Sequence, residues 1–205
     1  MTGIAGECRF DRSPADTPAV TRMLEVLAHR GRGRDVHADG RTAMGAVTDA
    51  STSESSGAGL LCDESAGLVL AFDGRIDNAA DLRSALASSA SQGPLDSDAA
   101  LVLRAYQAWG RSSVDRLVGD FVFVISDSRR ARIFAARDVF GVRPFFYRFE
   151  TGVFRFASEP QALARARDGS VRPNAGMVAE HLAGIVTSRD ETLIDGLWRL
   201  PPAHA

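Results

Sequence analysis

The side chains most often used as metal ligands or nucleophiles are few and scattered in this chain. Histidine and cysteine occur at His29, His37, His181, His204, Cys8 and Cys62. None of them stands at the spacing of a zinc site, so the sequence predicts no metal centre. The sequence also lacks a G-x-x-x-x-G-K-[ST] phosphate loop, a G-x-G-x-x-G dinucleotide turn and a G-x-S-x-G nucleophile elbow. We interpret the histidines, and Cys8, as surface or structural residues.

Basic residues are almost all arginine, because the chain contains no lysine. The 24 arginines are balanced by 26 acidic residues, for a formal net charge of −2. Nucleic-acid-binding domains are usually strongly basic, so this balance predicts no nucleic-acid partner. Arg30, Arg32 and Arg34 lie close together without interleaved aromatic residues, which favours a solvated loop. The run A-R-D-V-F-G-V-R-P at residues 136–144 could hold an anion, but its glycine and proline favour a rigid turn.

Length and composition are those of one large globular domain. The chain has 205 residues, of which 45% are hydrophobic and 24% charged. Two cysteines cannot form a disulfide framework, so we expect a reducing, cytoplasmic compartment. The sequence has neither a long apolar run nor a signal peptide, and we therefore expect no membrane partner.

Helix and strand patterns alternate along the first half of the chain. Residues 17–29 predict a helix with Thr17 as its cap and Pro18 in its first turn; its apolar face is formed by Val20, Met23, Leu24 and Leu27. The small polar residues 49–59 predict a mobile loop. A short strand is expected at 68–72, ending at Asp73-Gly74. Helices should follow after Asp77 or Asn78 and after Ser97-Asp98, with residues such as Leu82 and Leu101 facing inward.

The second half of the chain has the pattern of strands. Residues 121–126 (F-V-F-V-I-S) are apolar on both faces, which indicates that both faces are covered. Strands at 132–136, 144–149 and 153–157 follow closely and predict an antiparallel meander, with a helix near 175–183. We expect an α+β fold, a four-layer αββα sandwich of two antiparallel sheets with helices outside.

Eight segments, taken together and in order, resemble a known family. They are T-G-I-A-G at the N-terminus, L-A-H-R-G (27–31), D-G-R-I-D-N (73–78), S-D (97–98), R-L-V-G-D-F-V-F-V-I-S-D (116–127), A-R-D-V-F-G-V-R-P-F-F-Y (136–147), F-A-S-E-P-Q-A-L (156–163) and R-L-P-P-A-H (199–204). The chain resembles the N-terminal class II glutamine amidotransferase domain of the asparagine synthetase family. This domain is of the N-terminal-nucleophile (Ntn) type and has the same αββα sandwich. The D-G-R-I-D-N form is closest to asparagine-synthetase-like cyclases of lasso peptide biosynthesis.

The resemblance implies a particular chemistry. In this family an N-terminal Cys, exposed by removal of Met, attacks the glutamine side-chain amide, and its own α-amine is the base. An Asn side chain and a Gly N–H receive the oxyanion. Acidic residues hold the substrate ammonium, and an Arg holds its carboxylate. The ammonia released then passes to a second domain, which adenylates a carboxylate with ATP.

Carried over position by position, most of that site is altered. Thr2 stands where the nucleophilic Cys belongs, and Asp73 stands where the oxyanion Asn belongs. Gly74 and the acidic Asp98 are retained, whereas Arg75 replaces an acid. When the family's motif is aligned by counting back from Val47-Thr48-Asp49, Met44 stands where the family has the Arg that binds the substrate carboxylate. Thr2 is therefore a vestigial nucleophile position, with Asp73, Gly74 and Asp98 as the family's substrate-binding positions.

Three hypotheses for function follow. The first is a degenerate, glutaminase-inactive domain that supports an ATP-dependent, amide-forming asparagine synthetase-like enzyme, such as a lasso peptide macrolactam cyclase. The parent enzyme would resemble asparagine synthase (glutamine-hydrolysing), an ATP-dependent carbon–nitrogen ligase. The second is an active Ntn glutaminase or amidase that uses Thr2 and supplies ammonia for asparagine synthesis. The third is a regulatory module that binds an amino acid through Gly74 and Asp98.

The expected partner is an ATP-dependent synthetase domain, in cis or in trans. Residues 1–192 would form the amidotransferase-like domain, and residues 193–205 would form the junction to the synthetase. The S-G-G-x-D-S pyrophosphate loop is absent, so no cofactor is expected in this chain, and ATP and Mg would belong to the synthetase domain. Exposed apolar residues near 140–146 and 193–202, including Trp198, are the expected contact surface. A homo-oligomer is a further possibility.

Overall fold

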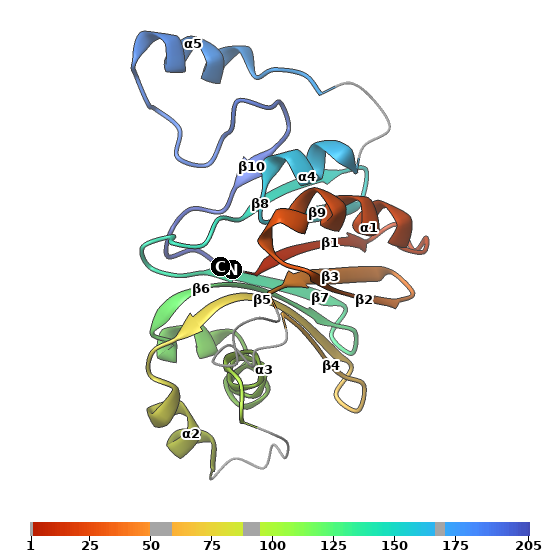
Figure 1. Ribbon diagram of the computed structural model, residues 1–205, viewed down its shortest axis with the longest axis vertical. Coiled ribbons are helices and arrows are strands. Elements are labelled where there is room, and N and C mark those ends of the chain that lie inside the picture. The colour runs from red at the N-terminus through yellow and green to blue at the C-terminus, as the bar shows by residue number, and fades with distance from the viewer. Residues whose placement is uncertain (1, 50–58, 88–94, 167–170) are drawn as a thin grey trace.

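Two antiparallel sheets packed face to face form the body of the protein (Figure 1). The computed structural model describes residues 2–49, 59–87, 95–166 and 171–205. Helices cover the outer face of each sheet, which gives four layers and confirms the expected αββα sandwich. The loop predicted at 49–59 lies almost entirely outside the described residues. No helix in the described ranges is long and apolar enough to cross a membrane.

The first sheet has six strands in the order β10-β8-β9-β1-β3-β2. These strands are β1 (Gly3–Arg9), β2 (Gly33–Asp39), β3 (Thr42–Thr48), β8 (Phe146–Glu150), β9 (Val153–Ala157) and β10 (Trp198–Arg199). Its outer face is covered by α1 (Thr17–Val26) and α4 (Pro160–Arg165), and the 3-10 helix η1 (Leu27–Arg30) continues α1. The cap of α1 is Asp16 rather than Thr17, because the Asp16 carboxylate accepts from the backbone N–H of Ala19.

The second sheet has four strands in the order β4-β5-β6-β7. They are β4 (Leu60–Asp63), β5 (Leu68–Ile76), β6 (Gly119–Asp127) and β7 (Arg132–Arg137). Helices α2 (Ala79–Ala87) and α3 (Asp98–Trp109) cover its outer face, and the 3-10 helix η2 (Gly110–Arg116) leads into β6. The predicted cap Ser97 is confirmed, since its hydroxyl accepts from the Ala100 N–H.

Strand β6 is buried on both faces, as its composition predicted. Phe121, Phe123 and Ile125 pack under α3, whereas Val122 and Val124 face the first sheet. Two other predictions were wrong. The meander is divided, with β6 and β7 in one sheet and β8 and β9 in the other. The strand expected to end at Asp73-Gly74 continues to Ile76, because both residues pair with β6.

The tail returns to the first sheet after an outlying helix. Helix α5 (Ala175–Ala183) has no buried residue and projects from the body in Figure 1. Further on, β10 pairs with β8, and Leu197 is buried beside α1 and α4. The Arg137 N–H donates to the carbonyl of His204, which ties the tail to β7. The division at residue 192 stays a prediction.

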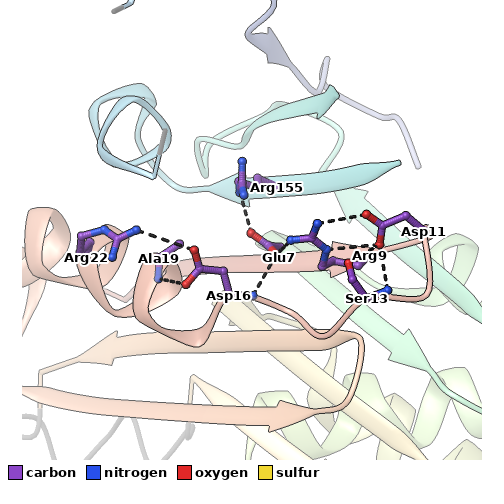
Figure 2. Close-up of polar contacts among 8 residues, drawn as sticks. All are labelled: Glu7, Arg9, Asp11, Ser13, Asp16, Ala19, Arg22 and Arg155. Atoms are coloured by element: carbon purple, nitrogen blue, oxygen red, sulfur yellow. Dashed lines mark hydrogen bonds and ion pairs between the residues drawn. The ribbon is translucent and has the colours of Figure 1, made fainter. Parts of the chain in front are cut away.

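A buried carboxylate fixes strand β1 to its surroundings (Figure 2). Glu7 is fully buried on the outer face of the first sheet. One oxygen accepts from the backbone N–H of Asp16 at 2.9 Å and from Arg9 at 3.3 Å, and the other accepts from Arg155 Nε at 2.7 Å. The same side chain therefore joins β1 to β9 and to the start of α1. Because Thr2 directly precedes β1, this network also helps to fix the position of Thr2.

Candidate functional site

The structure brings Thr2 and Asp73 together from the two sheets. Thr2 leads into β1, and Asp73 lies on β5 facing the space between the sheets. The backbone N–H of Thr2 faces the Asp73 carboxyl group and opposes the rise in its pKa. Thr2 is partly buried, and its methyl group packs on the backbone at Gly59, where an added Cβ would lie 2.8 Å from it.

Asp73 is a buried carboxylate flanked by two arginines. Only 1% of it is exposed. Its Oδ2 lies 3.9 Å from Arg30 Nη1, and its Oδ1 lies 3.8 Å from Arg143 Nη1. Both distances are within the range of an ion pair but are longer than the donor–acceptor distance of a hydrogen bond. Burial raises the pKa of Asp73 above its ordinary value, while the charges of Arg143 and Arg30 oppose that rise.

Two buried atoms at this site have no hydrogen-bond partner among the described residues. They are Asp73 Oδ2 and Arg143 Nε. Buried polar atoms are usually paired, and leaving one unpaired costs about 1–3 kcal/mol, or more for a charged group. Asp73 Oδ2 therefore lacks a hydrogen bond in the described structure, although two guanidinium groups lie beside the carboxylate.

Arg30 reaches the site from η1, and the prediction of a solvated loop was wrong for this residue. Its side chain is only 13% exposed, and its Nε lies 2.6 Å from Glu159 Oε1. Its Nη1 also donates to the carbonyl oxygen of Thr2 at 3.3 Å. Gly31 permits this arrangement, since a Cβ there would lie 2.3 Å from the backbone of Thr48. Arg30 thus contacts both the Thr2 carbonyl and Asp73 on β5.

Arg143 is presented by a rigid turn after β7. The buried Asp138 carboxylate accepts from the backbone N–H groups of Phe140, Val142 and Arg143 at 2.9, 3.1 and 3.4 Å. The Arg137 guanidinium closes the turn by donating to the carbonyls of Arg143 and Leu200, both at 2.6 Å, and of Gly141. The run predicted as a turn is therefore a turn that also carries a charge to Asp73, a role the sequence did not indicate.

The remaining sequence-predicted positions have other contacts. Gly74 sits so close to β6 that a Cβ would lie 2.4 Å from the Asp120 carbonyl oxygen, so only glycine fits. The Arg75 side chain is 65% exposed and pairs with Asp77 at 2.7 Å. The Asp98 carboxylate accepts from the backbone N–H of Ile76 at 2.9 Å, which joins the start of α3 to the end of β5.

Met44 and Cys8 belong to the core. Met44 is completely buried between the sheets, where it packs with residues such as Ile4 and Phe156. Cys8 lies at the other end of β1 from Thr2, and burial raises the pKa of its thiol to about 12. A thiol with that pKa is protonated at neutral pH and is a poor nucleophile. Within the described residues, no three His, Cys, Asp or Glu side chains form a group that could hold a metal ion.

Comparisons with known proteins agree with this architecture. The sequence profile of a family described as "Glutamine amidotransferase domain" matches residues 1–205. Asparagine synthetase [glutamine-hydrolyzing] 3 of Bacillus subtilis is 35% identical over 136 residues, which cover 65% of this chain and 22% of that protein. Putative asparagine synthetase [glutamine-hydrolyzing] 2 of Methanocaldococcus jannaschii is 24% identical over 202 residues, 89% of this chain and 38% of that protein. The chain thus spans well under half the length of these curated relatives.

Solved structures show the same fold at low sequence identity. Glutamine phosphoribosylpyrophosphate amidotransferase from B. subtilis, complexed with ADP and GMP, superposes with a TM-score of 0.64. That alignment has 21% identity and covers 80% of this chain and 43% of the other. A structure described as the allosteric regulatory enzyme of purine biosynthesis gives a TM-score of 0.63 at 20% identity, with the same coverage.

Proposed function

This chain belongs to the glutamine amidotransferase domain family, and from that premise we propose that it has lost glutamine hydrolysis. Its remaining role is to support an ATP-dependent, amide-forming synthetase of the asparagine synthetase type. One observation carries the proposal: Asp73, which the sequence resemblance aligns with the Asn that donates to the oxyanion, is a buried carboxylate.

An ionised Asp73 opposes the chemistry of amide hydrolysis. A carboxylate accepts hydrogen bonds but donates none, and it faces the negative charge that develops on the substrate oxygen. Loss of one oxyanion donor alone costs about 3–4 kcal/mol of transition-state stabilisation, and repulsion adds to that loss. Arg30 and Arg143 favour the ionised form of Asp73. The Thr2 hydroxyl is also a weaker nucleophile than the thiol it replaces.

One observation favours the alternative of an active amidase that uses Thr2. Burial raises the pKa of Asp73, and a carboxylic acid that stays protonated can donate a hydrogen bond to an oxyanion. An enzyme of this kind would lose activity as pH rises through the pKa of Asp73. The two candidates therefore differ both in activity and in its dependence on pH.

Ammonia release from glutamine tests the proposal. The chain beginning at Thr2 should release no more ammonia than its Thr2→Ala variant at any pH between about 5 and 8. The change Thr2→Cys together with Asp73→Asn restores the family's nucleophile and donor, and serves as the positive arm. A rate that depends on Thr2 in the otherwise unchanged chain would overturn the proposal.

Exposed apolar residues support a partner domain. The turn that carries Arg143 leaves Val139, Phe140 and Val142 exposed, with Phe140 82% exposed. Around the end of α5, Leu182, Ile185 and Val186 are exposed as well. Apolar surface of this kind marks interaction sites. We propose a synthetase domain, joined in cis or in trans, as the partner that also holds ATP and Mg. The D-G-R-I-D-N segment supports a lasso peptide macrolactam cyclase as the type of synthetase. The presence of only two cysteines supports a location in the cytoplasm.

Trp198 reports on this partner. Trp198 lies on β10, the part of the tail that pairs with β8, and 37% of its surface is exposed. In a Trp109→Phe background, binding of the synthetase domain should shift its emission to the blue and bury at least about 800 Å² on this side. Phe140→Asp should weaken the binding, whereas Val36→Asp, on strand β2 at the other edge of the first sheet, is the matched control. A chain that binds no synthetase domain and stays monomeric would contradict the scaffold role.

A further inference from the structure

Asp73 Oδ2 is a buried carboxylate oxygen without a hydrogen-bond partner among the described residues. Its nearest charges are guanidinium nitrogens at ion-pair distance, 3.8 and 3.9 Å from the carboxylate. The backbone N–H of Thr2 also faces this carboxylate. As an amide, that nitrogen has one hydrogen and no charge. A partly buried cation with several N–H donors at the same place would complete the site.

We propose that Asp73 is the binding site for the chain's own α-ammonium group in a chain that begins at Thr2. Hydrolysis of the Met1–Thr2 peptide bond by an aminopeptidase consumes one water molecule. The hydroxyl goes to the methionine carbonyl, and a hydrogen goes to the Thr2 nitrogen. The resulting amine takes up a proton from solvent and becomes an ammonium with three N–H donors. It can then donate to both oxygens of Asp73.

Neighbouring contacts keep the new ammonium in place. Arg30 Nη1 holds the Thr2 carbonyl at 3.3 Å, and the Ser158 hydroxyl accepts from the backbone N–H of Ile4 at 2.9 Å. Ile4 is completely buried, so the strand cannot shift without exposing core. Charge-assisted hydrogen bonds are roughly twice as strong as neutral ones. Exposure of the Thr2 amine therefore stabilises the fold, whether or not the site hydrolyses glutamine.

The absence of lysine makes this ion pair directly measurable. Because neither arginine nor histidine has a primary amine, the α-amine is the only primary amine in the chain. The probe is an N-hydroxysuccinimide ester, which acylates the neutral amine and not the ammonium. At pH 7.5, roughly the pKa of a free α-amine, acylation of the folded chain that begins at Thr2 should be at least about tenfold slower than in the Asp73→Asn variant. The Asp120→Asn variant is the matched control, since Asp120 is an exposed acid on the adjacent strand that pairs with Arg75. It should label as slowly as the unchanged chain.

Stability provides the second measurement and covers the case in which Asp73→Asn disturbs the site. A chain that begins at Thr2 is compared with one that carries an extra glycine before Thr2, by urea unfolding. The chain that begins at Thr2 should have an equilibrium constant for folding at least about tenfold larger, which is about 1.4 kcal/mol. The glycine should have no effect in the Asp73→Asn background and its full effect in the Asp120→Asn background.

The outcomes separate this proposal from the loss of glutaminase activity. Rapid acylation of the folded chain, or equal stability with and without the added glycine, would overturn the ion pair and leave the ammonia assay unaffected. Slow acylation together with ammonia release that depends on Thr2 would support the ion pair and overturn the proposed loss of hydrolysis.

Discussion

Removal of the Glu7 carboxylate should be the most damaging single change to a polar residue on the outer face of the first sheet. Glu7 is fully buried, and its two oxygens accept from Arg155, Arg9 and the backbone N–H of Asp16 (Figure 2). In Glu7→Ala the Arg155 guanidinium, only 17% exposed, loses the carboxylate at 2.7 Å. The N–H of Asp16 loses its acceptor at the start of α1.

The loss of stability in Glu7→Ala depends on which hydrogen-bond partners of Glu7 keep another acceptor. Removing one member of a buried ion pair costs about 3–5 kcal/mol. Arg9 keeps a second carboxylate, Asp11, at 3.0 Å, so its share of the loss is small. The Arg155 ion pair and the Asp16 hydrogen bond account for most of the effect. We therefore expect Glu7→Ala to lower the free energy of unfolding by about 3 kcal/mol, a large part of the stability of an ordinary domain.

Urea unfolding followed by circular dichroism measures this change. Arg22→Ala is the control, because Arg22 pairs with Asp16 at 3.8 Å with both side chains more than 40% exposed, and should cost less than about 1 kcal/mol. Replacing Glu7 and Arg155 together by methionine should cost less than Glu7→Ala alone, since no charge is then left unpaired. A loss below about 1 kcal/mol for Glu7→Ala, or a double change as costly as the single one, would refute this account.

Two further predictions concern the second sheet. Phe123→Ala should lower the free energy of unfolding by about 3–5 kcal/mol, because this fully buried ring leaves a cavity under α3, whereas Val118→Ala at an exposed position should change it by less than about 1 kcal/mol. Hydrogen bonds from Ser65 and Gln107 lower the pKa of Asp63 to about 2, so its stabilising effect is present above pH 4 and is lost as pH falls towards 2. Asp63→Asn should therefore lower the free energy of unfolding at pH 7 by at most about 2 kcal/mol. The difference from the unchanged chain should vanish near pH 2. A difference that is constant with pH would show that the charge of Asp63 is not involved.

Strands could be predicted where composition alone requires burial. The phenylalanines and valines of β6 indicate two covered faces, and the structure places a different layer on each. Strands β2 and β3 could not be recognised in this way. β3 (T-A-M-G-A-V-T) is built from small residues that fit only because the opposite sheet and α1 lie close to it. β2 is largely exposed and polar, and its pairing with β3 depends on contacts that local sequence does not encode.

The turn prediction at Asp73-Gly74 was wrong. This dipeptide usually marks a turn, yet here it lies inside β5. Glycine is required because β6 approaches too closely for a Cβ, and aspartate faces the gap between the sheets. The family resemblance pointed to Thr2 and Asp73, and the structure brings these two residues together. It could not indicate that Arg30 and Arg143 surround them, because neither arginine stands near Asp73 in the sequence.

The charges at this site are interdependent, which is why none of them could be interpreted singly. A buried Asp73 without arginines would lose its charge, and Arg143 without Asp73 would have a partly buried guanidinium with no carboxylate partner in the described structure. Arg30 differs, because Glu159 holds it independently at 2.6 Å. A return from Asp73 to asparagine therefore restores an oxyanion donor but leaves two positive charges close together, one of them unbalanced. Replacing Arg143 as well should therefore raise ammonia release above that of the chain with Thr2→Cys and Asp73→Asn, and an equal rate in the two chains would show that the charge of Arg143 does not matter there.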